Sequence, residues 1–269
     1  MRTEPDDSSP KLGYESRATV DPRCTPIKPA TRLLEGDAIP RKQHTAEEHE
    51  TWKILYARQR ERLTDRACRE FMYGLEIMGF PDDRIPDLSD IHHKLKKTTN
   101  WGISLAPGLI AAEDFYGSLA RRIFPCTDYI RGRDELDYTP APDCFHDIFG
   151  HTTLITEPYF ANFYQKFGQV AGRAQGQVHQ WLASFYWFTV EFGLINTPEG
   201  IRIYGNGILS SFSEVTHCLG KEVKRLPFNP QQMAEQPADL SIMQPILFVI
   251  DSFEQLETEF DRWTKKLGL

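Results

Sequence analysis

A carboxylate inside an apolar run is the first chemically informative feature of this sequence. Glu191 lies within WLASFYWFTVEFGLI, residues 181–195, which is otherwise mostly apolar and strongly aromatic. Moving an ionised carboxylate out of water is costly unless the group is paired, hydrogen-bonded or bound to a metal ion. The rest of the chain should therefore supply a partner for Glu191.

The segment PDCFHDIFGH, residues 142–151, offers two partners of the right chemistry. His146 and His151 are five positions apart, close to an expected helix start, and a modest distortion near Gly150 would let both face one ion. Two neutral imidazoles and one carboxylate are the ligands of open-faced non-haem iron sites and also of catalytic zinc sites. Together with Glu191, the two histidines predict a metal site.

Simpler interpretations of these residues remain open at this point. The two histidines could be ordinary hydrogen-bonded side chains. Glu191 could instead form a buried ion pair with an arginine, the candidates being Arg131, Arg173 and Arg202. A zinc protease is disfavoured because the sequence has no HExxH motif, in which a glutamate base stands between two histidine ligands.

Other residues near this predicted site suggest a substrate. Arg131 lies between two turn-forming stretches, where its guanidinium could hold a carboxylate through two parallel hydrogen bonds, or could simply be exposed. Trp187 and Phe192 flank Glu191, so they would stand near any metal it binds, although such aromatic residues are more often part of a core. An aromatic substrate would suit walls of this kind.

Composition excludes several classes of protein. The chain of 269 residues has a formal net charge of -7, which argues against a nucleic-acid or acidic-membrane partner, and its one basic cluster, residues 92–97, is short. Five widely spaced cysteines without a CxxC pair suggest neither a disulfide framework nor a zinc knuckle. No signal-peptide core or membrane span is visible, so we expect a soluble, cytoplasmic protein.

The elements that position these residues are mostly helices. Residues 1–40 are rich in proline and predict an extended or partly disordered arm, followed by a single catalytic domain over residues 41–269. Capping boxes predict helices starting at Thr45 and Ser252. Further helices are expected at 65–78, 89–97, 111–124, from about 143, at 158–173, at 178–194 and after 210; short strands are expected within 101–110, 127–132, 201–205 and 245–251. The predicted fold class is mainly helical with short β strands, an α+β domain.

Several of these segments together resemble a known family. They match, in order, the catalytic domain of the pterin-dependent aromatic amino acid hydroxylases, from about Asp37 to Phe253. The matching motifs are TWKILYARQ, PGLI, CTDYIRG, PDCFHDIFGH, YWFTVEFGLINTPEG, IRIYGNGILSSFSE and DSF. Within the family the chain is most similar to the short bacterial phenylalanine hydroxylases, because the regulatory domain and tetramerisation helix of the animal members are missing; we expect a monomer.

The resemblance implies an iron- and tetrahydropterin-dependent monooxygenase that hydroxylates the ring of an aromatic amino acid. Fe(II) would be held by His146, His151 and Glu191, with the remaining positions open to water and O2, the co-substrate. Tetrahydrobiopterin, or a related tetrahydropterin, would supply two electrons. The small-molecule substrate implied is L-phenylalanine, which would become L-tyrosine.

The family's other functional positions carry over to named residues of this sequence. The pterin would contact Gly108, Leu109, Ile110, Phe115, Asp147, Ala183 and Tyr186. The amino acid would contact Arg131, Tyr138, Thr139, Pro142, Asp143, Trp187, Phe192, Gly207 and Ser210. Glu214 would support the site from outside the metal ligands.

Departures from the family pattern keep other reactions in view. Trp187 resembles phenylalanine and tyrosine hydroxylases, whereas tryptophan hydroxylases carry Phe, and Val249 stands where tyrosine hydroxylases carry Asp. However, GHTTL at 150–154 replaces the usual GHVPL, Asn206 replaces a customary Ala, and Asp147 replaces the Glu of animal members. The alternatives are a phenylalanine 3-hydroxylase that makes meta-tyrosine, a tryptophan 5-hydroxylase, a zinc hydrolase using the same ligands, and a non-catalytic metal- or amino-acid-binding protein.

Overall fold

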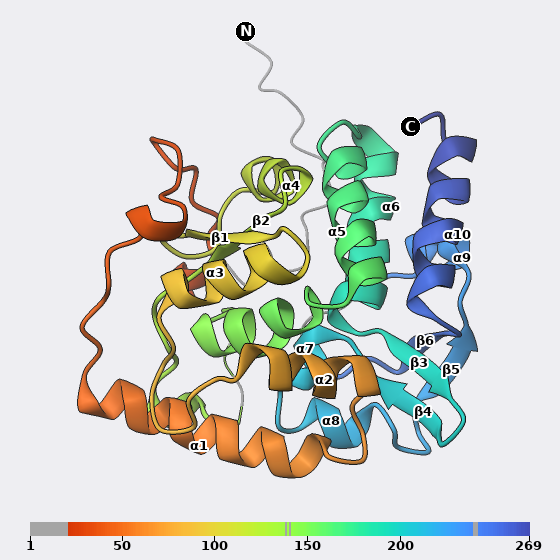
Figure 1. The fold of residues 1–269 in the computed structure, drawn as a ribbon. Helices are drawn as coiled ribbons and strands as arrows, with labels where there is room; N and C mark the ends of the chain where they lie inside the picture. The colour runs from red at the N-terminus through yellow and green to blue at the C-terminus, as the bar shows by residue number, and fades with distance from the viewer. Residues whose placement is uncertain (1–20, 138, 140, 239–241) are drawn as a thin grey trace, which may run out of the picture.

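The computed structural model describes residues 21–137, 139, 141–238 and 242–269. These residues form a mainly helical fold with short strands in two small sheets, as predicted (Figure 1). The α-helices are α1 (Ala46–Leu63), α2 (Arg69–Met78), α3 (Leu88–Thr98), α4 (Ala112–Ala120), α5 (Pro158–Ala171), α6 (Gly176–Tyr186), α7 (Asn206–Leu209), α8 (Glu214–His217), α9 (Pro230–Glu235) and α10 (Phe253–Lys266). Two π-helices, η4 (His146–Thr152) and η5 (Trp187–Glu191), lie between them, and short 3-10 helices cover Pro22–Cys24, Gly36–Ala38 and Arg133–Glu135.

Both sheets have short strands, and the larger of the two is mixed. Strands β1 (Gly102–Leu105) and β2 (Ile123–Cys126) pair in parallel. The larger sheet has the order β4-β3-β6-β5. Its strands are β3 (Leu194–Thr197), β4 (Gly200–Ile203), β5 (Lys224–Pro227) and β6 (Ile246–Ile250); β3 runs antiparallel to β4 and parallel to β6, which is also parallel to β5.

An aromatic core fixes the helix that leads into the predicted site. Phe163 on α5 meets Phe260 on α10 with ring centroids 5.3 Å apart, and Phe185 on α6 stacks on Trp263 of α10 at the same separation. Helices α5, α6 and α10 therefore pack side by side (Figure 1). Aromatic pairs add to the free energy of burial, so these contacts stabilise the packing of α6 near its C-terminus, where η5 begins.

Both predicted capping boxes start helices where expected. The Thr45 hydroxyl accepts the Glu48 amide at 3.2 Å and the Glu48 carboxylate accepts the Thr45 amide at 2.7 Å, which completes the box. At α10, Ser252 accepts the Gln255 amide at 3.0 Å, but the Gln255 side chain accepts the amide of Asp251 rather than that of Ser252. The second box is thus a variant in which the returning bond is displaced by one residue.

The strand predicted at residues 127–132 is wrong. The strand lies just before it, as β2, because Arg122 takes a left-handed φ of 58° that ends α4 earlier than the predicted residue 124. The backbone of 127–132 instead pairs with the segment around η4: the Thr127 amide donates to Asp147 and the Cys144 amide donates to the Tyr129 carbonyl. This region therefore connects β2 to the predicted site.

The helix predicted over 178–194 is shorter than expected. Its α-helical part ends at Tyr186, η5 follows, and Leu194 already belongs to β3. Gly193 marks the change, because its carbonyl accepts the amides of Tyr204 and Gly205. The helix predicted over 65–78 likewise begins later, at Arg69, and ends as predicted at Gly79, whose φ is 48°.

None of the described helices is both long enough and apolar enough to span a membrane.

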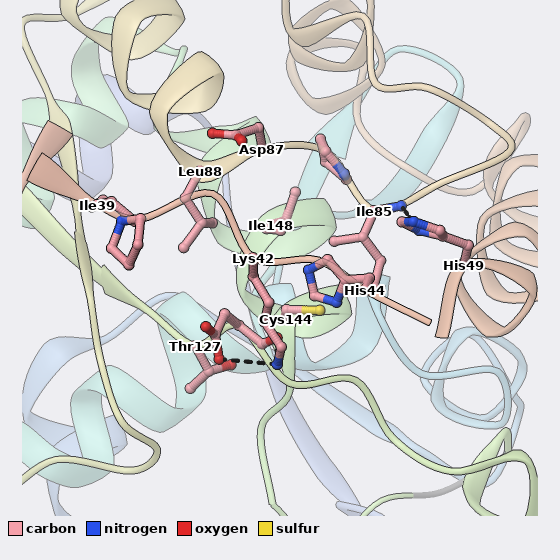
Figure 2. Close-up of a pocket in the computed structure, with 13 residues that line it drawn as sticks. Ile39, Lys42, His44, His49, Ile85, Asp87, Leu88, Thr127, Cys144 and Ile148 are labelled. Carbon is pink, nitrogen blue, oxygen red and sulfur yellow. Dashed lines mark hydrogen bonds and ion pairs between the residues drawn. The ribbon is translucent and has the colours of Figure 1, made fainter. Parts of the chain in front are cut away.

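A surface hollow lies between the segment before α1 and the loop before α3 (Figure 2). Its lining includes Lys42, His44, His49 and Thr127. The Lys42 ammonium donates to the Asp128 carbonyl at 2.6 Å, while burial lowers the pKa of His44. The lining includes none of the three predicted metal ligands, so this hollow is separate from the predicted site.

Candidate metal centre

The π-helix η4 explains how two histidines five positions apart reach the same ion. In an α-helix each residue advances about 100°, so a residue five positions on would point about 140° away. A π-helix has a wider turn, closed by hydrogen bonds between residues five apart, and this brings positions i and i+5 onto one face. His146 and His151 accordingly face each other, with ring centroids 4.7 Å apart and the two Nε2 atoms 2.9 Å apart.

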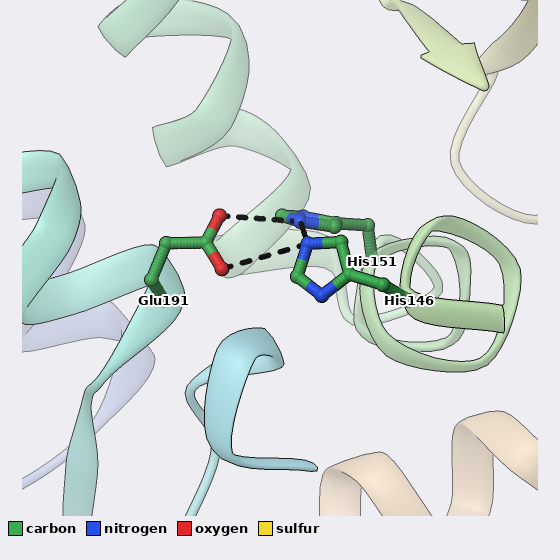
Figure 3. Close-up of side chains that lie close together, drawn as sticks. All are labelled: His146, His151 and Glu191. Atoms are coloured by element: carbon green, nitrogen blue, oxygen red, sulfur yellow. Dashed lines mark hydrogen bonds and ion pairs between the residues drawn. The ribbon is translucent and has the colours of Figure 1, made fainter. Parts of the chain in front are cut away.

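A second π-helix brings the carboxylate to the same place. In η5 the Phe192 amide donates to the Trp187 carbonyl at 2.9 Å, and Glu191 at its end points toward the two histidines (Figure 3). Its Oε1 lies 3.2 Å from Nε2 of His151, and its Oε2 lies 3.7 Å from Nε2 of His146. The three side chains offer ligand atoms that all lie within 4.8 Å of one another.

The protonation states of this cluster suit a cation. Burial lowers the pKa of His146 to about 4, so that its imidazole is neutral at pH 7. Burial alone would raise the pKa of Glu191, but the adjacent His151 and His146 outweigh it and hold this pKa below its usual range. A neutral imidazole and an ionised carboxylate are the forms that bind metals.

The arginines that could have paired with Glu191 lie elsewhere. Arg131 pairs with Asp143, the Arg173 guanidinium donates to the Gln169 carbonyl, and that of Arg202 donates to the carbonyl of Ile201. Two imidazole nitrogens and a carboxylate converge, and no cationic side chain of the described residues fills their centre. The donor set therefore fits a divalent metal such as iron.

The remaining ring nitrogens of the two histidines have buried partners. Nδ1 of His146 lies 2.8 Å from the Ser210 hydroxyl, which donates to the Asn206 carbonyl, also at 2.8 Å. Nδ1 of His151 lies 2.9 Å from Nδ2 of Asn206 and 3.4 Å from the Tyr164 hydroxyl. Such partners set the orientation and tautomer of metal-binding histidines.

Arg131 is buried in a tight ion pair beside this centre. Its side chain is 4% exposed, and that of Asp143 is 0% exposed. Nε and Nη2 of Arg131 each lie 2.8 Å from a carboxylate oxygen of Asp143, which also accepts the Arg131 amide at 2.9 Å and the His146 amide at 3.0 Å. Nη1 makes no hydrogen bond with any described residue, so this end of the guanidinium is available for an anion.

Asp147, on η4, is another buried carboxylate near the three proposed ligands. Its Oδ2 accepts the Thr127 amide at 2.8 Å and the Thr127 hydroxyl at 3.0 Å. Burial nevertheless dominates and raises the pKa of Asp147 to about 7. A buried carboxyl group with a strongly shifted pKa is typical of a functional site.

Aromatic side chains surround the three ligands. Phe124 stacks on His151 with ring centroids 4.8 Å apart, and Trp187 meets Phe192 at 4.4 Å. Phe115 contacts Tyr186 edge-on at 6.1 Å. These rings limit access of water to the centre, which strengthens the electrostatic interactions within it.

The remaining predicted site residues lie on five separate parts of the chain. Leu109 and Ile110, in the loop after β1 that also contains Gly108, lie against residue 27, whose amide donates to the Leu109 carbonyl at 2.8 Å. A Cβ on Gly207 would lie 3.2 Å from Glu191 Oε2, so α7 packs closely on the carboxylate. Ala183 lies on α6, and Thr139 and Pro142 precede η4. Glu214 lies on α8, where burial raises its pKa. Tyr138 is outside the described residues.

Sequence reasoning missed some contacts with the ligands. Tyr164 on α5 gave no signal, because its spacing is that of an ordinary core residue, yet its hydroxyl lies 2.8 Å from that of Tyr186 and reaches toward His151. Asn206 was visible as an unusual polar residue between glycines, but its contact with His151 depends on how α7 packs on η4.

Comparisons with known proteins give consistent results. A family model described as "Biopterin-dependent aromatic amino acid hydroxylase" matches residues 2–268. The phenylalanine-4-hydroxylase of Chromobacterium violaceum is 45% identical over 220 residues, covering 81% of this chain and 74% of that protein. The enzyme of the same name from Pseudomonas aeruginosa is 41% identical over 209 residues, covering 78% of this chain and 80% of that protein.

A solved structure shows the same arrangement of the chain. The C. violaceum phenylalanine hydroxylase with bound iron(III) and 7,8-dihydrobiopterin superposes with a TM-score of 0.83 at 38% identity, over 96% of this chain and 93% of that one. In that protein the metal and the oxidised cofactor are both present.

Proposed function

This chain belongs to the biopterin-dependent aromatic amino acid hydroxylase family, and on that basis we propose that it is an iron- and tetrahydropterin-dependent monooxygenase that converts L-phenylalanine to L-tyrosine. The observation that carries the proposal is the convergence of His146, His151 and Glu191 from two π-helices. Because the family model matches almost the whole chain, we interpret this cluster as the metal site of such a hydroxylase.

The metal and the pterin would be held by different parts of the site. His146, His151 and Glu191 would bind iron through two Nε2 atoms and the carboxylate. Phe115 and Tyr186 would contact the pterin ring, with Gly108, Leu109, Ile110 and Ala183 around it and Asp147 near its polar edge. Bound together, iron and tetrahydropterin supply the activation of O2 and the electrons that this requires.

The residues of the chain would bind and orient the amino acid. Nη1 of Arg131 would bind its carboxylate, since Asp143 already holds the other edge of the guanidinium in place. Trp187 and Phe192 would form walls for the substrate ring, with Pro142, Thr139, Gly207, Ser210 and Tyr138 completing the pocket. Fixing both ends of the substrate would place one ring carbon beside the metal.

Phenylalanine is the substrate we propose, because the named relatives act on it and Trp187 occupies the position expected for a phenylalanine hydroxylase. Hydroxylation at the meta position and hydroxylation of tryptophan are the remaining alternatives. The zinc hydrolase considered from the sequence is not supported, because the family match and the relatives are hydroxylases. We also propose that the protein is a cytoplasmic monomer whose catalytic domain covers residues 41–269, with residues 1–40 as an arm.

Product analysis tests the proposed reaction. Purified protein loaded with Fe(II) is supplied with tetrahydrobiopterin and air, and in separate reactions with phenylalanine, tyrosine or tryptophan. Para-tyrosine from phenylalanine is the expected product. Meta-tyrosine or 5-hydroxytryptophan would overturn the substrate assignment and keep the chemistry, whereas no hydroxylated product from any of the three would overturn the function.

A matched pair of variants tests the metal ligand. Glu191→Gln removes the charge of the proposed ligand with little change in shape, so it should abolish stoichiometric Fe(II) binding and product formation. Glu199→Gln makes the same change at an exposed turn and should behave as the wild type. Equal iron binding by the two variants would show that Glu191 is not a ligand.

A further inference from the structure

Asn206 is a fully buried polar residue that no part of the proposed reaction uses. It is 0% exposed and begins α7, which packs so closely on η4 that a Cβ on Gly150 would lie 3.2 Å from the Asn206 carbonyl oxygen. Its Nδ2 lies 2.9 Å from Nδ1 of His151, and its Oδ1 has no hydrogen-bond partner. Burying an amide with one end unpaired costs free energy, which calls for a compensating role.

The tautomer of His151 defines that role. Nε2 of His151 faces His146 and Glu191, so Nε2 is the atom that would bind the metal. A neutral imidazole that binds through Nε2 carries its proton on Nδ1, and this N–H needs an acceptor. The nitrogen and oxygen of a carboxamide have nearly the same shape, and a half-turn of the Asn206 amide places Oδ1 opposite Nδ1.

The backbone of the same residue governs the other histidine. The Asn206 carbonyl accepts the Ser210 hydroxyl at 2.8 Å, which leaves a lone pair of Oγ facing Nδ1 of His146, also 2.8 Å away. His146 therefore donates from Nδ1 to Ser210 and presents the lone pair of Nε2 to the metal. This second contact depends on the main chain at 206 and survives a change of side chain.

We propose that Asn206 is a positioning residue for the metal centre: its carboxamide oxygen accepts the Nδ1 proton of His151, and its backbone carbonyl, through Ser210, fixes His146 in the same tautomer. One residue of α7 thus sets both imidazoles with Nε2 toward the iron. The inference rests on the proposed function, because it assigns a role at the metal centre that this function uses.

Tyr164 is the competing partner of His151. Its hydroxyl lies 3.4 Å from Nδ1, longer than the 2.9 Å contact with Asn206, and 2.8 Å from the hydroxyl of Tyr186. Hydrogen bonds weaken with distance in this range, so Asn206 should be the stronger acceptor. Tyr164→Phe separates the two possibilities experimentally.

Metal affinity is the first measurement, made with Fe(II) alone under anaerobic conditions by equilibrium dialysis. Asn206→Leu removes the acceptor at similar volume and should raise the dissociation constant about 10- to 100-fold, the usual effect of losing such a partner. Asn206→Asp keeps an acceptor opposite Nδ1 and should bind Fe(II) at least as tightly as the wild type. Tyr164→Phe should change the constant less than Asn206→Leu does.

Proton positions are the second measurement, and its first part needs only the wild-type protein. In wild-type protein loaded with Zn(II), which is diamagnetic, nitrogen-resolved NMR should show Nδ1–H protons on both His146 and His151. In Asn206→Leu the His151 signal should shift while that of His146 stays unchanged. Neither measurement involves hydroxylation. The inference on Asn206 can therefore fail while the proposed function stands, and the proposed function can fail while this inference stands.

Three results would overturn the inference. The first is Fe(II) affinity in Asn206→Leu within twofold of the wild type. The second is equal weakening in Asn206→Asp and Asn206→Leu, which would show that no acceptor is needed opposite Nδ1. The third is an Nε2-protonated His151 in the metal-loaded wild type.

Discussion

Asp143→Asn should be among the most destabilising substitutions in this protein, because it leaves the Arg131 guanidinium buried without its counter-charge. The carboxylate of Asp143 is fully buried and receives four hydrogen bonds, three from Arg131 and one from the His146 amide, at 2.8–3.0 Å. Removing one partner of a buried ion pair costs about 3–5 kcal/mol. Folded domains of this kind have a total stability of about 5–15 kcal/mol, so the loss is a large fraction of it.

Thermal and urea unfolding followed by circular dichroism would measure this loss. At about 2–4 °C for each kcal/mol, the melting temperature should fall by roughly 6–20 °C. Asp83→Asn is the matched control, because Asp83 pairs with Arg84 at 2.9 Å while both side chains are more than 60% exposed, at 62% and 63%. An exposed pair of this kind contributes about 0–1 kcal/mol.

Replacing both partners gives a second check on the same reasoning. The double variant Arg131→Met with Asp143→Leu removes both charges together, so it should be more stable than Asp143→Asn alone. The explanation would be refuted if Asp143→Asn cost no more than Asp83→Asn, or if the double variant were the least stable of the three. Either result would mean that water or another group compensates the charge of Arg131.

Three further predictions concern pH, a helix cap and a glycine. Burial lowers the pKa of His44 below the ordinary value of 6.5, so the unfolded chain binds a proton that the folded chain does not. The free energy of unfolding should therefore fall as pH drops below about 6.5. Urea titrations at pH 7.5 and 5.5 should show a smaller fall in His44→Gln than in the wild type, and equal falls in the two proteins would contradict the prediction. Thr45→Ala removes the capping box of α1 and should cost about 1 kcal/mol in the same assay, an unchanged midpoint arguing against the cap. Gly193→Ala would place a Cβ 2.0 Å from a ring carbon of Tyr204, so it should lower the free energy of unfolding by more than about 4 kcal/mol or yield insoluble protein. A melting temperature near that of the wild type would contradict the packing described.

Local signals allowed the sequence to predict the elements that frame the site. The capping residues Thr45 and Ser252 mark the starts of α1 and α10, because a cap depends only on residues within one turn. Gly79 ends α2 for an equally local reason, its positive φ. The three proposed metal ligands were suggested by a carboxylate in an apolar run and two close histidines, and the resemblance to the family favoured them over the simpler interpretations.

Elements that depend on distant partners escaped sequence reasoning. Strand β5, with the sequence KRLP, has no alternation of apolar and polar residues and owes its conformation to pairing with the buried strand β6. The π-helical form of η4 and η5 could not be predicted from the sequence either, because their residues are compatible with an α-helix and the wider turn is imposed by packing. Asn206 reaches His151 only because α7 folds back onto η4.

The two π-helices make the metal centre depend on how many residues the chain has, as well as on which ones. A π-helical segment is in effect an α-helix with an extra residue in the turn. An in-frame loss of one codon within 187–190 would let η5 close as an α-helix and would carry the Glu191 side chain about 100° around the helix axis. All three ligand residues would still be encoded, yet the centre would be dismantled. A one-residue insertion or deletion is therefore a short mutational route by which a helical protein gains or loses such a site.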